Sequence, residues 1–222
     1  MGVATLDIIN RVAAYPGEDE EVRALAQARR VGGNAANTAT VLAQLGDRAS
    51  WAGNLGDCPE ADRIRRHFDR YGVDHVLAHR VARGGVPTSC VTLSEATGSR
   101  TIVHWRDLPE YAAASFKAVY PGAFDWIHFE GRAVSELQAM VRHARTRSGR
   151  PVSLEVEKPR EGIESLFDQV DVLFFSHHYL QVQGQEDPEV FLHGLPEGIL
   201  ATCTWGARGA WGRDGQGRIL HQ

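Results

Sequence analysis

The chain has 222 residues, a formal net charge of −4 and a hydrophobic share of 43%. These values predict a soluble globular protein, and the lack of a basic surplus argues against nucleic-acid binding. No run of 18 apolar residues and no basic signal-peptide start are present, so we expect neither a membrane span nor secretion. The three widely spaced cysteines, Cys58, Cys90 and Cys203, favour a reducing, cytoplasmic location.

Short apolar runs alternate with helical stretches along the chain. Strands are predicted at 3–9, 49–53, 126–129, 152–156, 172–176 and 199–204, and helices at 35–45, 61–71, 135–148 and 162–167. Asn34 and Ser135 are the predicted caps of two helices, and Gly46 and Gly72 are predicted to follow two helix ends. Strands separated by such helices indicate βαβ crossovers, so the sequence predicts an α/β fold with a mostly parallel sheet flanked by helices.

Two stretches depart from this alternation. Residues 11–30 are charged and irregular. Residues 86–104 contain two β-rich runs around a Gly98-Ser99 turn, which predicts a hairpin. A hairpin inserted into an α/β protein is a candidate lid over a binding site.

Two glycines and an asparagine stand directly before the first predicted helix. Glycines allow close backbone approach and positive φ, and a helix start offers unpaired N–H donors. Asn34 and Asn37 add carboxamides three residues apart, on nearly the same helix face. This array suits a polyhydroxyl ligand, since each hydroxyl both donates and accepts. A glycine turn followed by an ordinary Asn cap explains the same residues.

Asp7 interrupts an apolar strand close to its predicted end. A carboxylate there is costly unless it is paired or serves a site. At the C-terminal end of a parallel strand it would face the usual ligand crevice, where it could accept from two sugar hydroxyls. The alternative is an aspartate that ends the strand in a turn.

Several motifs carry a family resemblance. The segments GGNAANTATVLAQLG, GVPTSCVTL, GSRTIVHW, WIHFEGR, VSLEVEKPRE and ATCTWGARGA occur in this order along nearly the whole chain. Together they resemble the ketohexokinase (fructokinase) branch of the ribokinase-like (PfkB) sugar kinases. The resemblance implies a ribokinase-like sandwich with a small β-sheet lid, formed here by about residues 10–30 and 86–104 of a single, incomplete domain.

The resemblance also implies roles for individual residues. Asp7, Gly33, Asn34 and Asn37 match residues that hold the sugar. The matches to nucleotide contacts are Arg100, Gly206, Ala207, Arg208 and Gly209. Asp19 matches an acid that reaches the partner's site when two lids clasp in a homodimer. Solvated charges and a plain hairpin turn are the alternatives.

The family's activity would follow as well. It implies transfer of the ATP γ-phosphoryl group to a ketose, with fructose giving fructose 1-phosphate, and the use of Mg²⁺, with K⁺ as a further cation. The pairs Glu130–Arg132 and Glu155–Glu157 could serve phosphate or Mg²⁺, but structural ion pairs, the latter with Lys158 or Arg160, explain them equally well.

Two family motifs have no match in these residues. The Gly-Ala-Gly-Asp motif, whose aspartate is the family's base, is absent, and Ser176-His177-His178-Tyr179 stands in place of the magnesium motif. Asp214 lies in a glycine-rich turn. We therefore expect a chain that is truncated and has no kinase activity as written. The alternative to a kinase is a sugar-binding or dimerising homologue without catalysis.

Overall fold

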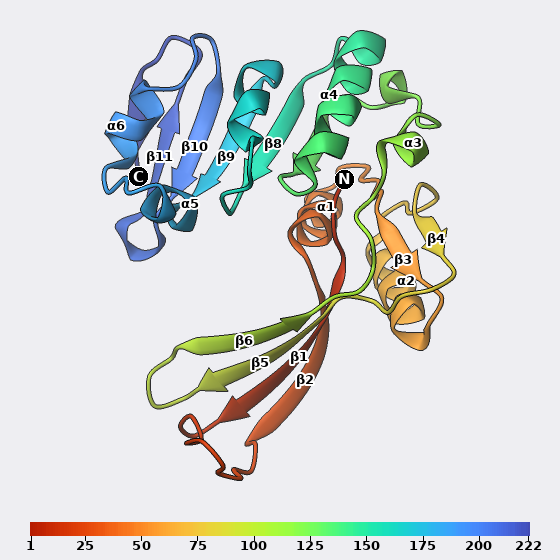
Figure 1. Ribbon diagram of the computed structural model, residues 1–222, viewed down its shortest axis with the longest axis vertical. Coiled ribbons are helices and arrows are strands. Elements are labelled where there is room, and N and C mark those ends of the chain that lie inside the picture. Colours follow the sequence, from red (N-terminus) through yellow and green to blue (C-terminus); the bar gives the residue numbers. More distant parts are fainter. The chain divides into compact units, whose positions relative to one another are not determined.

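The computed structural model describes all residues from 1 to 222 and divides them into two compact units (Figure 1). One unit comprises Gly2–Glu110. The other comprises Tyr111–Gln222 together with Met1. None of the helices in either unit combines the length and apolar character needed to cross a membrane.

The first unit contains a four-stranded sheet that extends away from its helices (Figure 1). Its strands are β1 (Thr5–Val12), β2 (Ala26–Gly32), β5 (Thr88–Ser94) and β6 (Arg100–Trp105), in the order β2-β1-β5-β6. β1 runs antiparallel to β2 and parallel to β5, and β5 forms a hairpin with β6. The predicted hairpin is therefore confirmed. The prediction of irregular structure up to Arg30 is wrong, because residues 26–30 belong to β2.

The helices of this unit cover a small apolar core. α1 spans Asn34–Gln44, α2 spans Pro59–Tyr71, and β3 (Asn54–Gly56) pairs in parallel with β4 (His79–Val81). Trp51 and Phe68 are almost fully buried and their rings pack with centroids 5.1 Å apart. Residues 49 and 51–53 are buried, but residues 49–53 do not form the predicted strand; a single bridge joins Ser50 to Asp74. The core fixes the base of the four-stranded sheet through Ala4 and Leu6.

The second unit is built on a six-stranded sheet of order β12-β11-β10-β9-β8-β7. The strands are β7 (Ile127–Glu130), β8 (Val152–Val156), β9 (Val172–Ser176), β10 (Leu200–Thr204), β11 (Ala210–Arg213) and β12 (Ile219–His221). β7 to β10 are parallel and the last two strands are antiparallel, which confirms the mostly parallel sheet.

Helices complete this unit. They are α3 (Ala113–Phe116), α4 (Val134–Ser148), α5 (His177–Val182) and α6 (Pro188–His193), with 3₁₀ turns η1 (Pro121–Ala123), η2 (Ile163–Gln169) and η3 (Gly206–Arg208). Strand alternation places Phe129, Leu154 and Leu173 on one face of the sheet, where all three are fully buried. Ala133, not Ser135, precedes the first turn of α4, so the predicted cap is wrong.

Candidate functional site

The Gly-Gly-Asn turn requires glycine at its second position. Gly33 has φ 95° and ψ 134°, and a Cβ built there would lie 2.3 Å from the carbonyl oxygen of Val3. No residue with a side chain fits this backbone without a shift. Gly33 is the N-cap residue of α1 and no side chain caps the helix, so the prediction of Asn34 as the cap is wrong. Asn34 is instead the first helical residue.

The two carboxamides lie on the first turn of α1. Asn34 is half-buried and Asn37 is exposed. The backbone N–H of Asn37 donates to the carbonyl of Gly33 at 2.9 Å, and this hydrogen bond closes the first turn of the helix. The turn therefore presents the N-terminal end of α1 and both carboxamides at one place.

Asp7 lies beside this turn. Its carboxylate packs over the backbone of Gly32, where an added Cβ would approach its Oδ2 to 2.1 Å, and the hydroxyl of Thr5 donates to its Oδ1 at 3.0 Å. Asp7 is half-buried and forms no ion pair. The structure thus brings Asp7 to the Gly-Gly-Asn turn, although the two lie far apart in sequence.

The place of Asp7 in its strand differs from the prediction. Asp7 lies inside β1, not at its end, because the strand continues to Val12 into the four-stranded sheet. The sheet is mixed, since β1 has an antiparallel and a parallel neighbour. The carboxylate therefore lies on a sheet face, not at the end of a parallel strand.

The predicted nucleotide residues lie on two separate units. Arg100 is the exposed first residue of β6, in the first unit. The segment Gly206–Gly209 follows β10 in the second unit and contains the 3₁₀ turn η3. Gly206 and Gly209 have φ of 56° and 86°, and the amide of Trp205 donates to the carbonyl of Gly209 at 2.8 Å. The turn connects two antiparallel strands and keeps two positions that favour glycine.

Aromatic rings hold Arg208 within this turn. Its guanidinium lies 4.6 Å from the ring centre of Trp205 and 5.6 Å from that of Trp211. His221 stacks on Trp211 with centroids 4.0 Å apart and contacts the carbonyl of Arg208 at 2.8 Å. These contacts fix the cation next to the glycine turn.

Asp214 has structural partners in the next turn. Its Oδ1 accepts from the amides of Gln216 and Arg218, each at 2.9 Å, and the Arg218 guanidinium donates to Oδ2 at 2.6 Å. These hydrogen bonds, foremost from the Arg218 backbone, hold the pKa of Asp214 below its usual value. The carboxylate is thus engaged in closing the turn.

Among the remaining predicted acids, Glu130 and Glu157 form ion pairs. Glu130 is buried and pairs with Arg132 at 3.3 Å, as the structural interpretation expects. Glu157 lies 3.9 Å from Lys158, and both side chains are about half exposed. Asp19 has φ 61°, a left-handed conformation that is uncommon outside glycine, in the exposed β1–β2 connection.

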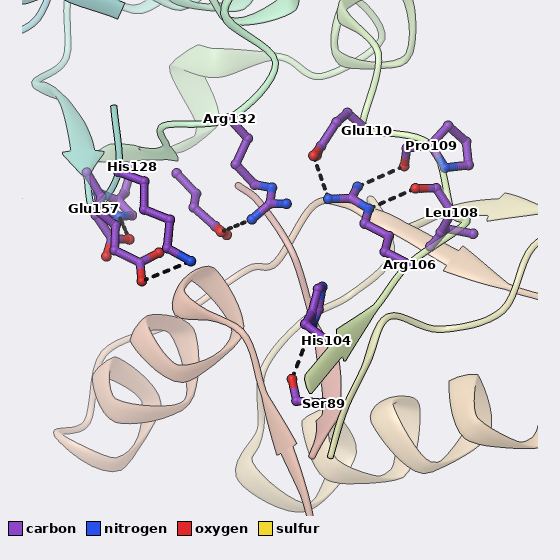
Figure 2. A network of polar contacts seen from close by, with 12 residues as sticks. Ser89, His104, Arg106, Leu108, Pro109, Glu110, His128, Arg132 and Glu157 are labelled. Carbon is purple, nitrogen blue, oxygen red and sulfur yellow. Dashed lines mark hydrogen bonds and ion pairs between the residues drawn. The ribbon is translucent and has the colours of Figure 1, made fainter. Parts of the chain in front are cut away.

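A polar row that sequence reasoning missed crosses the four-stranded sheet at Asp7. In the strand register Asp7 lies opposite Arg30 on β2 and opposite Ser89 on β5, and Ser89 lies opposite His104 on β6. The Ser89 hydroxyl lies 3.2 Å from Nδ1 of His104 (Figure 2). The sequence carries one sign of this row: the segments VPTSC and IVHW face each other across the predicted hairpin, which places Ser89 near His104.

Beyond the row, Arg106 fixes the chain that leaves β6. Its guanidinium donates to the carbonyls of Leu108 and Pro109 at 2.8 and 3.2 Å, and it pairs with Glu110 (Figure 2). Asn54 donates to the carbonyls of Pro109 and Glu110 at 2.9 and 3.1 Å. The chain that follows β6 is therefore held by Arg106 and by Asn54 of β3, both in the first unit.

Comparison with known proteins identifies the family of the chain. The model of the pfkB family of carbohydrate kinases matches residues 2–222. The chain belongs to the pfkB family. This pfkB protein is 35% identical to mouse ketohexokinase over 233 residues, which cover all of the chain and 78% of the mouse protein.

Solved structures agree with the family's fold. Ribokinase from Giardia lamblia matches with a TM-score of 0.85 at 14% identity, covering 99% of the pfkB chain and 77% of its own. Arabidopsis thaliana ribokinase, solved with ribose and ATP, matches with a TM-score of 0.78 at 19% identity, covering 100% and 75%. At these identities the likeness concerns the fold, and it confirms the predicted ribokinase-like α/β architecture.

Proposed function

We propose that this carbohydrate kinase transfers the γ-phosphoryl group of ATP to a ketose, and that fructose yields fructose 1-phosphate. The observation that carries the proposal is the contact between the Asp7 carboxylate and the Gly-Gly-Asn turn, in a chain 35% identical to mouse ketohexokinase. A carboxylate beside a helix start provides acceptors and donors together, which adjacent sugar hydroxyls require.

In this proposal Asp7, Gly33, Asn34 and Asn37 bind the ketose. Thr5 engages one oxygen of Asp7, and no ion pair neutralises the carboxylate. Gly33 forms the turn that precedes α1, because the carbonyl oxygen of Val3 lies where any larger residue would place its Cβ. The ketose hydroxyls would donate to Asp7 and exchange hydrogen bonds with the carboxamides.

The proposed nucleotide contacts are Arg100 in the first unit and, considered separately, the turn of Gly206, Ala207, Arg208 and Gly209 in the second unit. The support is the positive φ of both glycines and the fixed Arg208 guanidinium, a group suited to phosphate oxygens. ATP would supply the phosphoryl group. No group of three His, Cys, Asp or Glu side chains is arranged to hold a metal ion, so we assign no ligand for Mg²⁺ or K⁺.

We further propose a homodimer formed through the four-stranded sheet, with Asp19 reaching the partner. The same sheet face that carries Asp7 continues with Ile9, Val91 and Ile102, and Ile102 is 48% exposed. An exposed sheet with apolar side chains and open edges is a liability unless it is covered. A second copy would cover it.

The alternative function is a homologue that binds a sugar or dimerises without catalysis. The 222 residues contain no Gly-Ala-Gly-Asp motif, and the carboxylate of Asp214 is engaged by Arg218. A kinase needs a positioned base and donors for the transferring group. Under either function we expect the 222 residues by themselves, which lack this motif, to bind ketose without turnover.

Calorimetry of fructose binding to the 222-residue protein tests the sugar site. Asp7→Ala and Asn34→Ala should each weaken binding by about 1–3 kcal/mol, since a sugar hydroxyl is left without its partner. Asn10→Ala is the matched control, because Asn10 lies on β1 and bonds to Gln27 at 2.9 Å. Unchanged fructose affinity in both site variants would rule out the proposed site.

A further inference from the structure

The polar row across the sheet suggests a further sugar contact. Residues paired directly across neighbouring strands point to the same face of a sheet. The register therefore places the side chains of Asp7, Ser89 and His104 in succession on β1, β5 and β6. Ser89 is 8% exposed, whereas His104 is exposed at the open edge of the sheet.

The distance spanned by the row is close to the size of a monosaccharide. Neighbouring strands lie about 4.8 Å apart, so the backbones at Asp7 and His104 are separated by roughly 10 Å. A hexose ring with its hydroxyls bridges such a gap between a carboxylate and an imidazole. Ser89 lies between them and can donate as well as accept.

The polarity of the row also fits a sugar. Asp7 only accepts hydrogen bonds, while the imidazole of His104 carries an N–H. The next row on the same face is apolar and consists of Ala28, Ile9, Val91 and Ile102. The polar side chains therefore end abruptly beside Asp7, which is what a site for a small polyhydroxyl ligand needs.

We propose that His104, oriented by Ser89, contacts the ketose and determines which hydroxyl configuration is accepted. The contact between the Ser89 hydroxyl and Nδ1 fixes the orientation of the imidazole ring on the sheet face that carries Asp7. This inference rests on the proposed function, because it places His104 at the sugar site of Asp7. Its ligand class is a cyclic ketohexose.

The experiment is calorimetry of the 222-residue protein with fructose and its epimers psicose, tagatose and sorbose. His104→Phe keeps an aromatic ring but removes the N–H, and it should lower fructose affinity about tenfold. It should also change the ranking of the four sugars. His104→Gln retains a donor and should stay within about threefold of the original protein. His79→Phe, at an exposed position of β4, is the matched control.

The outcomes separate this inference from the proposed function. Unchanged affinities in His104→Phe, with binding lost in Asp7→Ala, would overturn the role of His104 and leave the sugar site intact. If His104→Phe lowers the affinity for all four sugars equally and also lowers the melting temperature, His104 has a structural role, and the proposed sugar contact is overturned. If the unmodified protein binds none of the four ketoses, the proposed function fails, and this inference fails with it.

Discussion

Replacing Gly33 with alanine should destabilise the first unit through a steric conflict that can be worked from the structure. A positive φ in a residue with a side chain costs about 1–3 kcal/mol. The new Cβ would also lie 2.3 Å from the Val3 carbonyl oxygen and 2.9 Å from its carbon. Relieving such overpacking costs about 1–3 kcal/mol more, so the expected total is about 4 kcal/mol.

Gly46→Ala isolates the overlap. Gly46 has φ 100°, close to the 95° of Gly33, but nothing lies within 4 Å of its Cβ position. It should therefore lose only the backbone contribution, about 2 kcal/mol. Urea unfolding, followed by hydrogen exchange in peptides of α1 and β1, measures both variants. Equal destabilisation by Gly33→Ala and Gly46→Ala would refute the reasoning, since only the first meets the Val3 carbonyl.

Three further predictions concern assembly, catalysis and pH. Light scattering should show a dimer, and Ile102→Lys should shift it to a monomer while Val190→Lys, at an exposed site of the second unit, should not; a strictly monomeric folded protein would count against the sheet interface. In a coupled ADP-release assay the 222-residue protein should give background turnover, and fructose-dependent turnover that disappears in Asp7→Ala would contradict this. Burial and the nearby Arg70 lower the pKa of His67 below 6.5. The unfolded chain then takes up the proton first, so stability should fall as pH drops through 6.5 and should fall less in His67→Gln. An unaltered pH dependence in that variant would show that other groups dominate.

Local signals in the sequence predicted much of the fold. α2 ends where Gly72 adopts the left-handed conformation, as its glycine indicates, and the bounds of β8 and β9 match the predicted apolar runs. β2 escaped prediction because most of its residues are exposed, so it lacks the alternation of a half-buried strand. The Asn34 cap was misplaced by one residue, because Gly33 adopts the turn conformation itself.

The site was harder to predict than the elements. The glycines and carboxamides were evident from spacing, but their contact with Asp7 depends on the pairing of β1 with β2. Ser89 and His104 enter the same row only through the parallel pairing of β1 with β5, which joins segments about 80 residues apart. Long-range register is not encoded in any local pattern, so these residues became visible only in the folded sheet.

The continuity of β1 links the proposed sugar site to the proposed dimer face. Asp7 and Ile9 are alternate residues of one strand and share one side of the sheet. A partner that packs on Ile9 would change the twist of the strand that aims the carboxylate of Asp7. Thermodynamic linkage makes the effect reciprocal: the factor by which dimer formation changes the affinity for ketose is also the factor by which ketose binding changes the affinity between the subunits. Fructose affinity should then depend on protein concentration.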